Sequence, residues 1–344
     1  MSPDRRQFLR IAGALTLGPV VGAGCGSEAG RDSPSSDSET GSPGDGTTWD
    51  GYEDAVVVDA LSGPIQFNIP QESLPRGEVA LEQVRASGIT AVNLTVNRRA
   101  EGEVSAFEAT RARIAEWIQE VERHPEILSL ARSVDDIRAA KRAGVSALVL
   151  GFQDTVPFEN DLDDLDAFHE SGLRIVQLTY NVQNRVGSGC LAPSDQGLTD
   201  FGRETVSRLD ELGILVDLSH CGPRTTLEGI QASRRPVSIT HSGCDALFAH
   251  PRSKDDATLR LLAERGGVVG IYLMPFLNAS GPPAAADVVA HVEHALNVCG
   301  EDHVGIGSDQ GIVPLDVSGD FPNRFAEVSA QRAALGIAAP REDT

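Results

Sequence analysis

Two histidines stand at the ends of two short apolar runs in the second half of the chain. His220 closes the run Ile214-Leu-Val-Asp-Leu-Ser-His220, and His241 lies near the end of Pro236-Val-Ser-Ile-Thr-His-Ser242. A third apolar run, Val304-Gly-Ile-Gly-Ser-Asp309, ends in a carboxylate. Imidazole and carboxylate groups that converge on one point can hold a divalent metal ion and move a proton beside it. The three runs therefore indicate a site for metal-dependent hydrolysis.

The segments that carry these residues are predicted to be strands of a (β/α)8 barrel. Near-continuous runs of Val, Ile and Leu are typical of parallel strands buried on both faces, and amphipathic helical segments lie between them. Strict alternation of this kind favours a parallel sheet closed into a barrel, whose strands converge at their C-terminal ends. The eight predicted strands are 55–60, 89–96, 146–153, 173–180, 214–220, 236–242, 267–273 and 304–309.

A ninth apolar run, 127–131, is interpreted as an extra element between the second and third strands. A doubly wound sheet is the alternative fold, and it is disfavoured because no glycine-rich phosphate loop follows the first strand. Ser133 is expected to cap a helix that runs through Arg142, and Gly213 is expected to end another. The remaining predicted helices are 104–123, 198–212, 225–232, 255–265, 285–298 and 325–335. A barrel normally closes with a longer final helix, so whether the C-terminus is truncated is left open.

The two histidines can share one ion. A lone histidine is more often a satisfied core or surface residue, but adjacent strands lie about 5 Å apart, so both imidazoles can reach the same cation. Asp309 could ligate the ion, take a proton from the attacking water, or simply cap a helix. The sequence predicts one zinc or other divalent ion at His220 and His241, with Asp309 as the catalytic residue.

Other polar residues fall at the same strand ends. Arg252, in the loop after the strand of His241, could hold a substrate carboxylate or be an ordinary surface arginine. Tyr180 and Asn181 could donate hydrogen bonds to substrate, although tyrosine is also common in packing at strand ends. Gln153 ends the third strand but is a poor ligand for zinc, and Asp59 is the only ionisable group at the end of the first.

The first 50 residues have the composition of a targeting segment and a tether. A twin-arginine pattern at Arg5-Arg6 precedes the apolar stretch 11–21, which is too short to span a bilayer comfortably. Cys25 follows small residues, as in a lipobox, so either lipidation at Cys25 or simple cleavage nearby is expected. We predict a signal segment at 1–25, a disordered Ser/Gly/acidic tether at 26–50 and a barrel domain at 51–344, with the mature protein outside the cytoplasm.

Charge and cysteine content limit the partners. The chain has 50 acidic and 29 basic residues among 344, a net charge of −21, and phosphate binding needs clustered Lys and Arg. Nucleic acid is therefore excluded, and membrane contact is expected only through a lipid anchor. A small molecule or dipeptide is the expected partner, and the oligomeric state is left open, a dimer included. Four cysteines could pair outside the cytoplasm or remain buried thiols: Cys190, Cys221, Cys244 and Cys299.

From the third strand onward the sequence resembles the membrane (renal) dipeptidase family of zinc metallopeptidases. The resemblance rests on Leu178-Thr-Tyr-Asn181, Gly197-Leu-Thr-Asp-Phe-Gly-Arg203, Gly213-Ile-Leu-Val-Asp-Leu-Ser-His220, Thr240-His-Ser242, His250-Pro-Arg252, Gly266-Gly-Val-Val-Gly270 and Gly305-Ile-Gly-Ser-Asp309. It implies an amidohydrolase-like (β/α)8 barrel that hydrolyses dipeptides at a two-zinc centre. His220 and His241 match the family's two late-strand zinc ligands, Arg252 its substrate-binding arginine, and Asp309 its proton-handling acid.

The chain departs from that family in the first half of the site. The family pattern Asp-Gly-His-Asn-Asp aligns with Asp59-Ala-Leu-Ser-Gly63, so that Leu61 and Gly63 replace two ligands. Gln153 replaces a bridging glutamate, and Tyr180 replaces a histidine that helps to hold substrate. One ion is therefore expected rather than two.

Three functions remain open from the sequence. The first is an exported metallohydrolase that cleaves dipeptides or similar small amides with metal-activated water, and it is favoured by the retention of His220, His241 and Asp309. The second is a non-catalytic or repurposed barrel that binds a small peptide-like ligand, and it is favoured by the loss of the first-strand ligands. The third is a mononuclear amidohydrolase with another specificity.

Overall fold

The computed structural model describes residues 49–65, 78–158, 161–281, 283–313 and 321–342. The predicted signal segment with Cys25, and almost all of the predicted tether, lie outside these residues. Among the residues that are described, no helix has the length and apolar character needed to cross a membrane.

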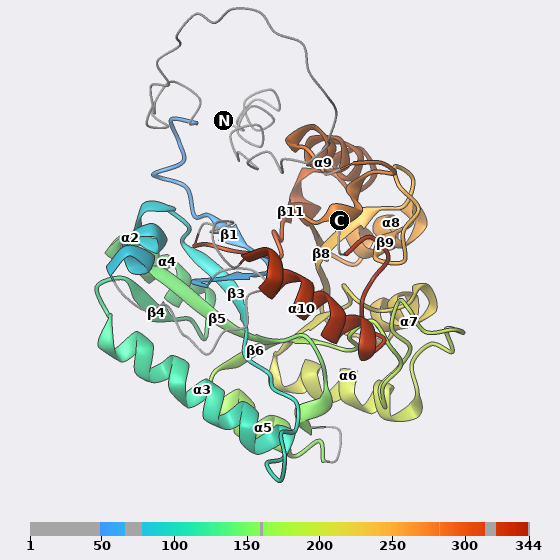
Figure 1. Ribbon diagram of the computed structural model, residues 1–344, viewed down its shortest axis with the longest axis horizontal. Coiled ribbons are helices and arrows are strands. Elements are labelled where there is room, and N and C mark those ends of the chain that lie inside the picture. The colour runs from blue at the N-terminus through green and yellow to red at the C-terminus, as the bar shows by residue number, and fades with distance from the viewer. Residues whose placement is uncertain (1–48, 66–77, 159–160, 282, 314–320, 343–344) are drawn as a thin grey trace, which may run out of the picture.

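Eight parallel strands form the barrel in the order predicted from the sequence (Figure 1). Each predicted strand overlaps one observed strand. Seven observed strands lie within the predicted runs and are shorter than them, whereas β8 extends two residues beyond its predicted end at 242. In order around the sheet they are β1 (Val58–Asp59), β3 (Ala91–Thr95), β5 (Ser146–Phe152), β6 (Leu173–Gln177), β7 (Leu215–Asp217), β8 (Ser238–Cys244), β10 (Val268–Ile271) and β11 (Val304–Ile306).

The first and last strands meet, which excludes the doubly wound alternative. The amide of Ala60 donates to the carbonyl of Ile306 at 2.9 Å, and the amide of Asp309 donates to the carbonyl of Leu61 at 2.9 Å. Just beyond these contacts, β2 (Ser62–Gly63) pairs in parallel with β12 (Gln310–Gly311). The C-terminal ends of the first and last strands therefore lie side by side.

Two further short strands extend this sheet. The ninth apolar run forms β4 (Leu128–Leu130), which pairs with the first half of β5, while the second half of β5 pairs with β6. The run is thus the extra element predicted from the sequence. The other short strand, β9 (Ser253–Lys254), directly follows Arg252 and pairs with the end of β8.

Helices surround the barrel, and their ends follow the capping residues. Ser133 accepts the amide of Asp136 at the start of α4, and Gly213 adopts the left-handed conformation (φ 71°) after α6. Helices α2 and α5 were not predicted from the sequence. The helices are α2 (Glu78–Ala86), α3 (Ala106–Arg123), α4 (Val134–Ala143), α5 (Asp164–Glu170), α6 (Asp200–Leu212), α7 (Pro223–Ala232), α8 (Asp256–Glu264), α9 (Ala285–Cys299) and α10 (Phe321–Ala334).

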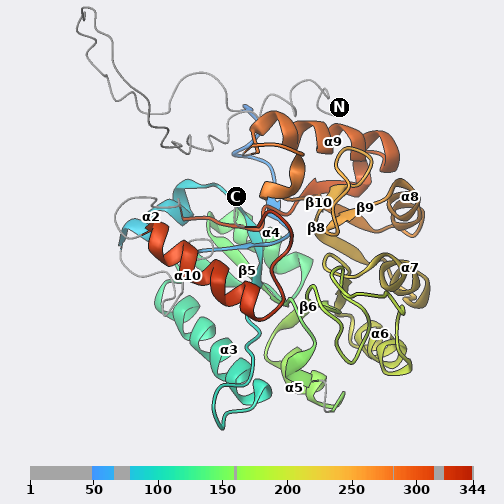
Figure 2. The same cartoon turned by 45° about the vertical axis from the view of Figure 1, so that its right-hand side comes forward.

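The final helix, α10, differs from the others in its packing. Figures 1 and 2 both show it lying across the front of the barrel, with the chain after it running back toward β8 and β9. None of its residues is buried, whereas Ile337 and Ala339 in the following segment are. The C-terminal segment is therefore held to the barrel mainly by the residues after the helix.

Candidate active site

The two histidines lie next to one another, as predicted from the sequence. His220 follows β7 by three residues and His241 lies within β8, and both side chains are buried. Their Nε2 atoms are 2.8 Å apart, and the ring centroids are 4.9 Å apart. Adjacent strands therefore bring two imidazole nitrogens to one point.

The second nitrogen of each ring is occupied by a neighbouring side chain. His220 Nδ1 lies 2.6 Å from Asn181 Oδ1, an amide oxygen that can only accept, so the ring donates from Nδ1. His241 Nδ1 lies 2.8 Å from Thr240 Oγ1, which itself donates to Asp217 Oδ2 at 2.7 Å. His241 must then also donate from Nδ1. Both rings therefore direct an unprotonated Nε2 at the same point, the form in which histidine binds metal.

Asp217 supports the His241 side of the pair. It is buried at the end of β7, where it accepts hydrogen bonds from the amide and hydroxyl of both Ser219 and Thr240. Burial raises the pKa of the Asp217 carboxyl, and these hydrogen bonds oppose the rise. Four donors around one carboxyl group suit an acceptor without a proton, so Asp217 fixes the hydroxyl that receives the His241 N–H.

Burial also determines the charge of the two imidazoles. It lowers the pKa of His220 and of His241 well below the usual range, and the positive charges of Arg252 and Lys254 lower both further. Both rings are therefore neutral at neutral pH. A neutral imidazole is a metal ligand, whereas an imidazolium is not.

These residues fit one side of a metal site. Two neutral imidazoles with their Nδ1 atoms engaged are suitable donors for zinc or a similar ion. A catalytic zinc ordinarily has three protein ligands, and within the described part of the chain no three His, Cys, Asp or Glu side chains cluster closely enough to hold an ion. Asp309 therefore does not complete the site in the way expected from the sequence.

A cavity of about 190 Å³ adjoins the histidine pair at the C-terminal ends of the strands. His220 lines it, whereas His241 and Asp59 do not. The cavity brings together five other residues singled out in the sequence, namely Gln153, Tyr180, Asn181, Arg252 and Asp309. Residues from the third, fourth, fifth, sixth and eighth strand ends thus converge on one small space.

Arg252 is a buried cation in the wall of this cavity. Its side chain is 2 % exposed, and its Nη2 donates to the carbonyl of His241 at 3.2 Å. Its Nε has no hydrogen-bond partner, and its guanidinium carbon lies 5.7 Å from the centre of the Tyr272 ring. A buried guanidinium with an unused donor can bind a carboxylate that enters the cavity.

Asp309 lies across the cavity, directly after β11. Its backbone has a left-handed φ of 56°, which is uncommon outside glycine and characteristic of constrained sites. Burial raises the pKa of its carboxyl to about 7, although the positive charges of Arg252 and Arg332 oppose the rise. Asp309 can therefore both take up and release a proton near neutral pH.

Tyr180 packs directly on the histidine pair. Its ring stacks on that of His220 with a centroid distance of 4.3 Å and an interplanar angle of 22°. The guanidinium carbon of Arg332, from α10, lies 5.6 Å from the centre of the Tyr180 ring. Tyr180 therefore contacts both His220 and Arg332 as well as lining the cavity.

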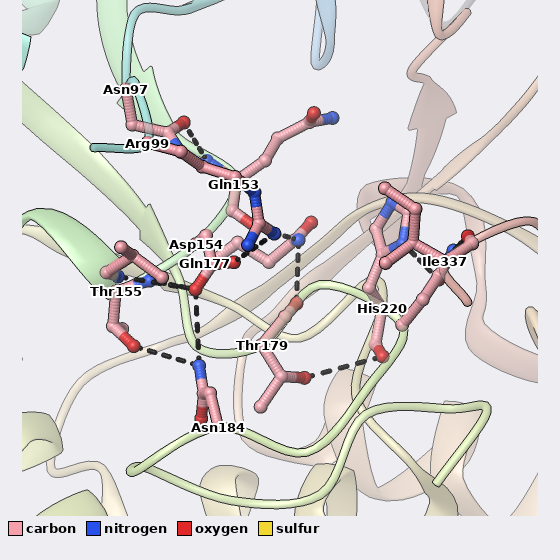
Figure 3. A network of polar contacts seen from close by, with 12 residues as sticks. Asn97, Arg99, Gln153, Asp154, Thr155, Gln177, Thr179, Asn184, His220 and Ile337 are labelled. Carbon is pink, nitrogen blue, oxygen red and sulfur yellow. Dashed lines mark hydrogen bonds and ion pairs between the residues drawn. The ribbon is translucent and has the colours of Figure 1, made fainter. Parts of the chain in front are cut away.

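Gln153 is held by its backbone. Its amide donates to Asn97 Oδ1 at 2.9 Å, and its carbonyl accepts from Gln177 Nε2 at 2.5 Å. Figure 3 shows these contacts, with the carboxamide of Gln153 turned away from them. The side chain is thus left to face the cavity.

The residue after Gln153 is an acid whose role was missed in the sequence. Asp154 pairs with Arg99 at 3.2 Å and accepts from Asn184 Nδ2 at 3.3 Å, so it belongs to the polar network beside the cavity (Figure 3). Asp59 is likewise structural, because it accepts the amides of Leu61 and Ser308. Burial raises the pKa of Asp59 to about 6.

The end of the first strand is filled by apolar packing. Leu61 is buried and lines the cavity, and a Cβ added at Gly63 would lie 2.8 Å from Leu94 Cδ1. No ligand side chain occupies these two positions. This side of the cavity is therefore apolar, as expected from the replaced residues.

The C-terminal segment adds cavity residues that no sequence motif indicated. Arg332 and Glu342 form an ion pair, and both line the cavity. The helix that carries Arg332 was predicted, but nothing in its sequence pointed to the barrel mouth. The four described cysteines, Cys190, Cys221, Cys244 and Cys299, are free thiols.

A family model described as membrane dipeptidase (peptidase family M19) matches residues 47–331. The dipeptidase tcpJ of Claviceps purpurea is 31% identical over 222 residues, which cover 63% of this chain and 52% of the relative. An uncharacterized protein from the pqqA 5′ region of Klebsiella pneumoniae is 32% identical over 219 residues, covering 60% and 81% of the two chains. The match thus spans only about half the length of the Claviceps relative.

Solved structures show the same fold. The crystal structure of an amidohydrolase from Pseudomonas aeruginosa is 34% identical, with a TM-score of 0.69 over 81% of this chain and 79% of that one. A metallopeptidase from Rhodobacter sphaeroides, bound to a phosphinate mimic of L-Ala-D-Ala, is 19% identical, with a TM-score of 0.64 over 83% and 94% of the two chains. The second likeness supports the fold alone.

Proposed function

Because the chain belongs to the membrane dipeptidase family (peptidase family M19), we propose that it is a metal-dependent hydrolase that cleaves dipeptides or similar small amides. The observation that carries this proposal is the facing pair His220 and His241 beside a cavity lined by Arg252 and Asp309. The pair supplies neutral imidazoles, the arginine supplies a free cationic donor, and the acid has a pKa near neutrality. The metallopeptidase and dipeptidase names of relatives agree with this chemistry.

Each residue has a defined part in the proposed reaction. His220 and His241 would hold one zinc or other divalent ion, which supplies Lewis-acid polarisation of a carbonyl and activation of water. Arg252 binds the substrate carboxylate and so fixes the position of the scissile amide. Asp309 accepts a proton from the attacking water and returns it to the leaving nitrogen. Tyr180 and Gln153 border the space left for the rest of the substrate.

A single ion agrees better than two with the shape of the site. The first-strand positions that would carry further ligands are Leu61 and Gly63, and Leu61 packs against the cavity. Gln153, at the third strand end, contributes a neutral amide. Only the histidine side of a metal centre is therefore available among the described residues.

A second function is favoured by the same apolar first-strand end. A barrel with an incomplete centre could bind a small peptide-like ligand through Arg252 without hydrolysing it, or act on another amide as a mononuclear amidohydrolase. The dipeptidase and the binding barrel differ in turnover and not in binding, because Arg252 serves both, whereas the other amidohydrolase differs in its substrate.

Assays with defined dipeptides distinguish them. We expect purified protein to hydrolyse members of a panel of L,L and L,D dipeptides, with activity lost on chelation and restored by zinc, manganese or cobalt. The His241→Ala variant should be inactive with every metal. Binding of a dipeptide in calorimetry without any release of amino acids would refute the hydrolase and support the binding barrel. Release from N-acyl amino acids alone would support the other amidohydrolase.

We also propose that the protein is exported and anchored by lipid at Cys25. The twin-arginine pair Arg5-Arg6, the apolar stretch 11–21 and the small residues before Cys25 support this. Replacing Arg5 and Arg6 by lysine should retain the precursor in the cytoplasm on fractionation, and Cys25→Ala should release mature protein from the membrane. Normal export of the double-lysine variant would refute the twin-arginine route.

A further inference from the structure

One carboxamide joins the histidine pair to the C-terminal segment. Asn181 is 1 % exposed, and its Oδ1 lies 2.6 Å from His220 Nδ1 while its Nδ2 donates to the carbonyl of Ile337 at 2.7 Å. His220 and Ile337 are seen on the same side of the polar network in Figure 3. The oxygen and one of the two N–H groups of this amide are thus engaged by protein.

The segment Arg332–Glu342, here called the strap, touches the barrel at other polar points. His250 Nε2 lies 2.9 Å from the carbonyl of Pro340, and Arg332 pairs with Glu342 within the strap. Arg332 also lies over Tyr180, which stacks on His220. Two adjacent residues, Tyr180 and Asn181, therefore contact both the strap and His220.

The strap has few buried apolar residues to hold it on the barrel. Helix α10, whose last residues begin the strap, has no buried residue, and the buried apolar residues of the strap are Ile337 and Ala339. A segment with few buried apolar contacts opens at low free energy compared with the barrel core. Since Arg332 and Glu342 line the cavity, opening the strap would expose it.

We propose that Asn181 is a positioning residue that couples closure of the strap over the cavity to the orientation of His220. With the strap closed, the Ile337 carbonyl fixes the Asn181 amide, whose oxygen then holds the His220 ring with Nε2 directed at His241. With the strap open, the amide is free to turn and His220 loses its constraint. A substrate that closes the strap would thereby align the site. The benefit to catalysis rests on the proposed function, but the coupling itself does not.

The backbone of Asn181 determines which variants can test this. Its φ of 58° is left-handed, a conformation that glycine, asparagine and aspartate accept best. Asn181→Asp keeps an oxygen acceptor for His220 but loses the N–H donor to Ile337. Asn181→Gly keeps the backbone and removes both contacts. The pair of variants therefore separates the two halves of the coupling.

The experiment uses the full chain labelled with ¹⁵N-histidine, with hydrogen exchange measured on the same samples. Loss of one hydrogen bond is worth about 1 kcal/mol, so we expect amide exchange over 335–342 to quicken about fivefold or more in both variants. The Nδ1–H signal of His220 should persist in Asn181→Asp and should be lost in Asn181→Gly. Neither readout requires activity, so failure of the hydrolase proposal would leave this test intact.

Glu342→Gln provides a test that leaves Asn181 untouched. It weakens the pair with Arg332, so strap exchange should quicken and the His220 signal should broaden. The matched control is Glu327→Gln on the exposed face of α10, where neither should change. Unchanged strap exchange in Asn181→Asp, or an unaltered His220 signal when Glu342→Gln opens the strap, would overturn the coupling. A fast-exchanging strap in Glu327→Gln would overturn it as well, since any change to α10 would then suffice.

Discussion

His220 and His241 face each other Nε2 to Nε2 at 2.8 Å, and each ring is held from behind by a different polar partner. Asn181 fixes one ring and Thr240, backed by Asp217, fixes the other. Two nitrogen lone pairs at this separation repel each other unless a proton or a metal ion lies between them. A cation bound between the two Nε2 atoms would relieve this repulsion, so the arrangement favours metal binding, which can be measured.

Removing either histidine should weaken the binding of a metal ion. We expect wild-type protein to bind about one divalent ion per chain and His220→Ala and His241→Ala to bind much less than one, measured by elemental analysis after dialysis. The proposed activity should fall by at least about a hundredfold, because loss of a residue that merely supports a metal ligand already costs about 10- to 100-fold. His169→Ala, on α5 away from the cavity, is the matched control and should retain the ion. A stoichiometry near two in wild type would contradict the single-ion site.

Arg252 should discriminate between substrates by their carboxylate. A charge-assisted hydrogen bond contributes about 1.5–3 kcal/mol, so Arg252→Gln should raise KM about tenfold to a hundredfold for a dipeptide with a free C-terminus. The same change should have little effect on the corresponding dipeptide amide, which wild type should already bind weakly. Equal losses on both substrates would show that Arg252 supports the fold of the cavity instead of binding the carboxylate.

Asp309 should impose a pH profile on the reaction. Its pKa is raised to about 7 by burial, so if it acts as the base, kcat/KM should rise with pH up to about 7 and then level off. Asp309→Asn should lower kcat by about a hundredfold to ten-thousandfold and remove this rise. If kcat/KM of the Asn variant still rose by the same factor over the same pH range, the titration would belong to another group.

The Asp309 carboxyl should make the protein less stable as pH rises, whereas it makes the proposed reaction faster. Because its pKa is raised in the native state, the native protein binds more protons than the unfolded chain between about pH 4 and pH 7. The free energy of unfolding contributed by Asp309 therefore falls as pH rises through that range. Urea titrations should show that Asp309→Asn gains stability relative to wild type at pH 8 but not at pH 4, and a constant difference at both would contradict this.

Two glycines at the end of the barrel provide a matched pair for stability. A Cβ at Gly307 would lie 1.8 Å from the carbonyl oxygen of Thr240, whereas a Cβ at Gly305 would meet nothing within 4 Å. Overpacking against backbone costs about 1–3 kcal/mol or more, so Gly307→Ala should lower the melting temperature by several degrees and displace His241. Gly305→Ala should stay within about 0.5 kcal/mol of wild type. Similar melting temperatures for the two variants would refute the close approach.

The barrel and the histidine pair were predictable because both depend on patterns that are local in sequence. Each strand is a short run of branched apolar residues, and the polar residue that follows it must project from the C-terminal end. The position of β4 outside the main order was also predictable, since nine runs had to fill eight places. The sequence therefore located His220, His241, Arg252 and Asp309 in one region.

The roles of Asn181 and Asp154 depended on contacts that no local pattern encodes. Asn181 was expected to donate to substrate, and the hydrogen bond from its amide to the carbonyl of Ile337, 156 residues later in the chain, was not foreseen. Asp154 was not singled out in the sequence, and its pairing with Arg99 joins residues 55 positions apart. The position of the strap could not be predicted for the same reason. Its contacts with the barrel are a few long-range polar contacts, which produce no apolar periodicity in the sequence.

The closure of the barrel has a consequence for the order of folding. Asp59 accepts the amide of Ser308, and the two residues are 249 positions apart. Bringing such distant segments together carries a loop-closure cost that the intervening helices and strands must first offset by folding. We therefore expect the cavity wall formed by Leu61 and Asp309 to be among the last parts to assemble, after the strands that carry the two histidines.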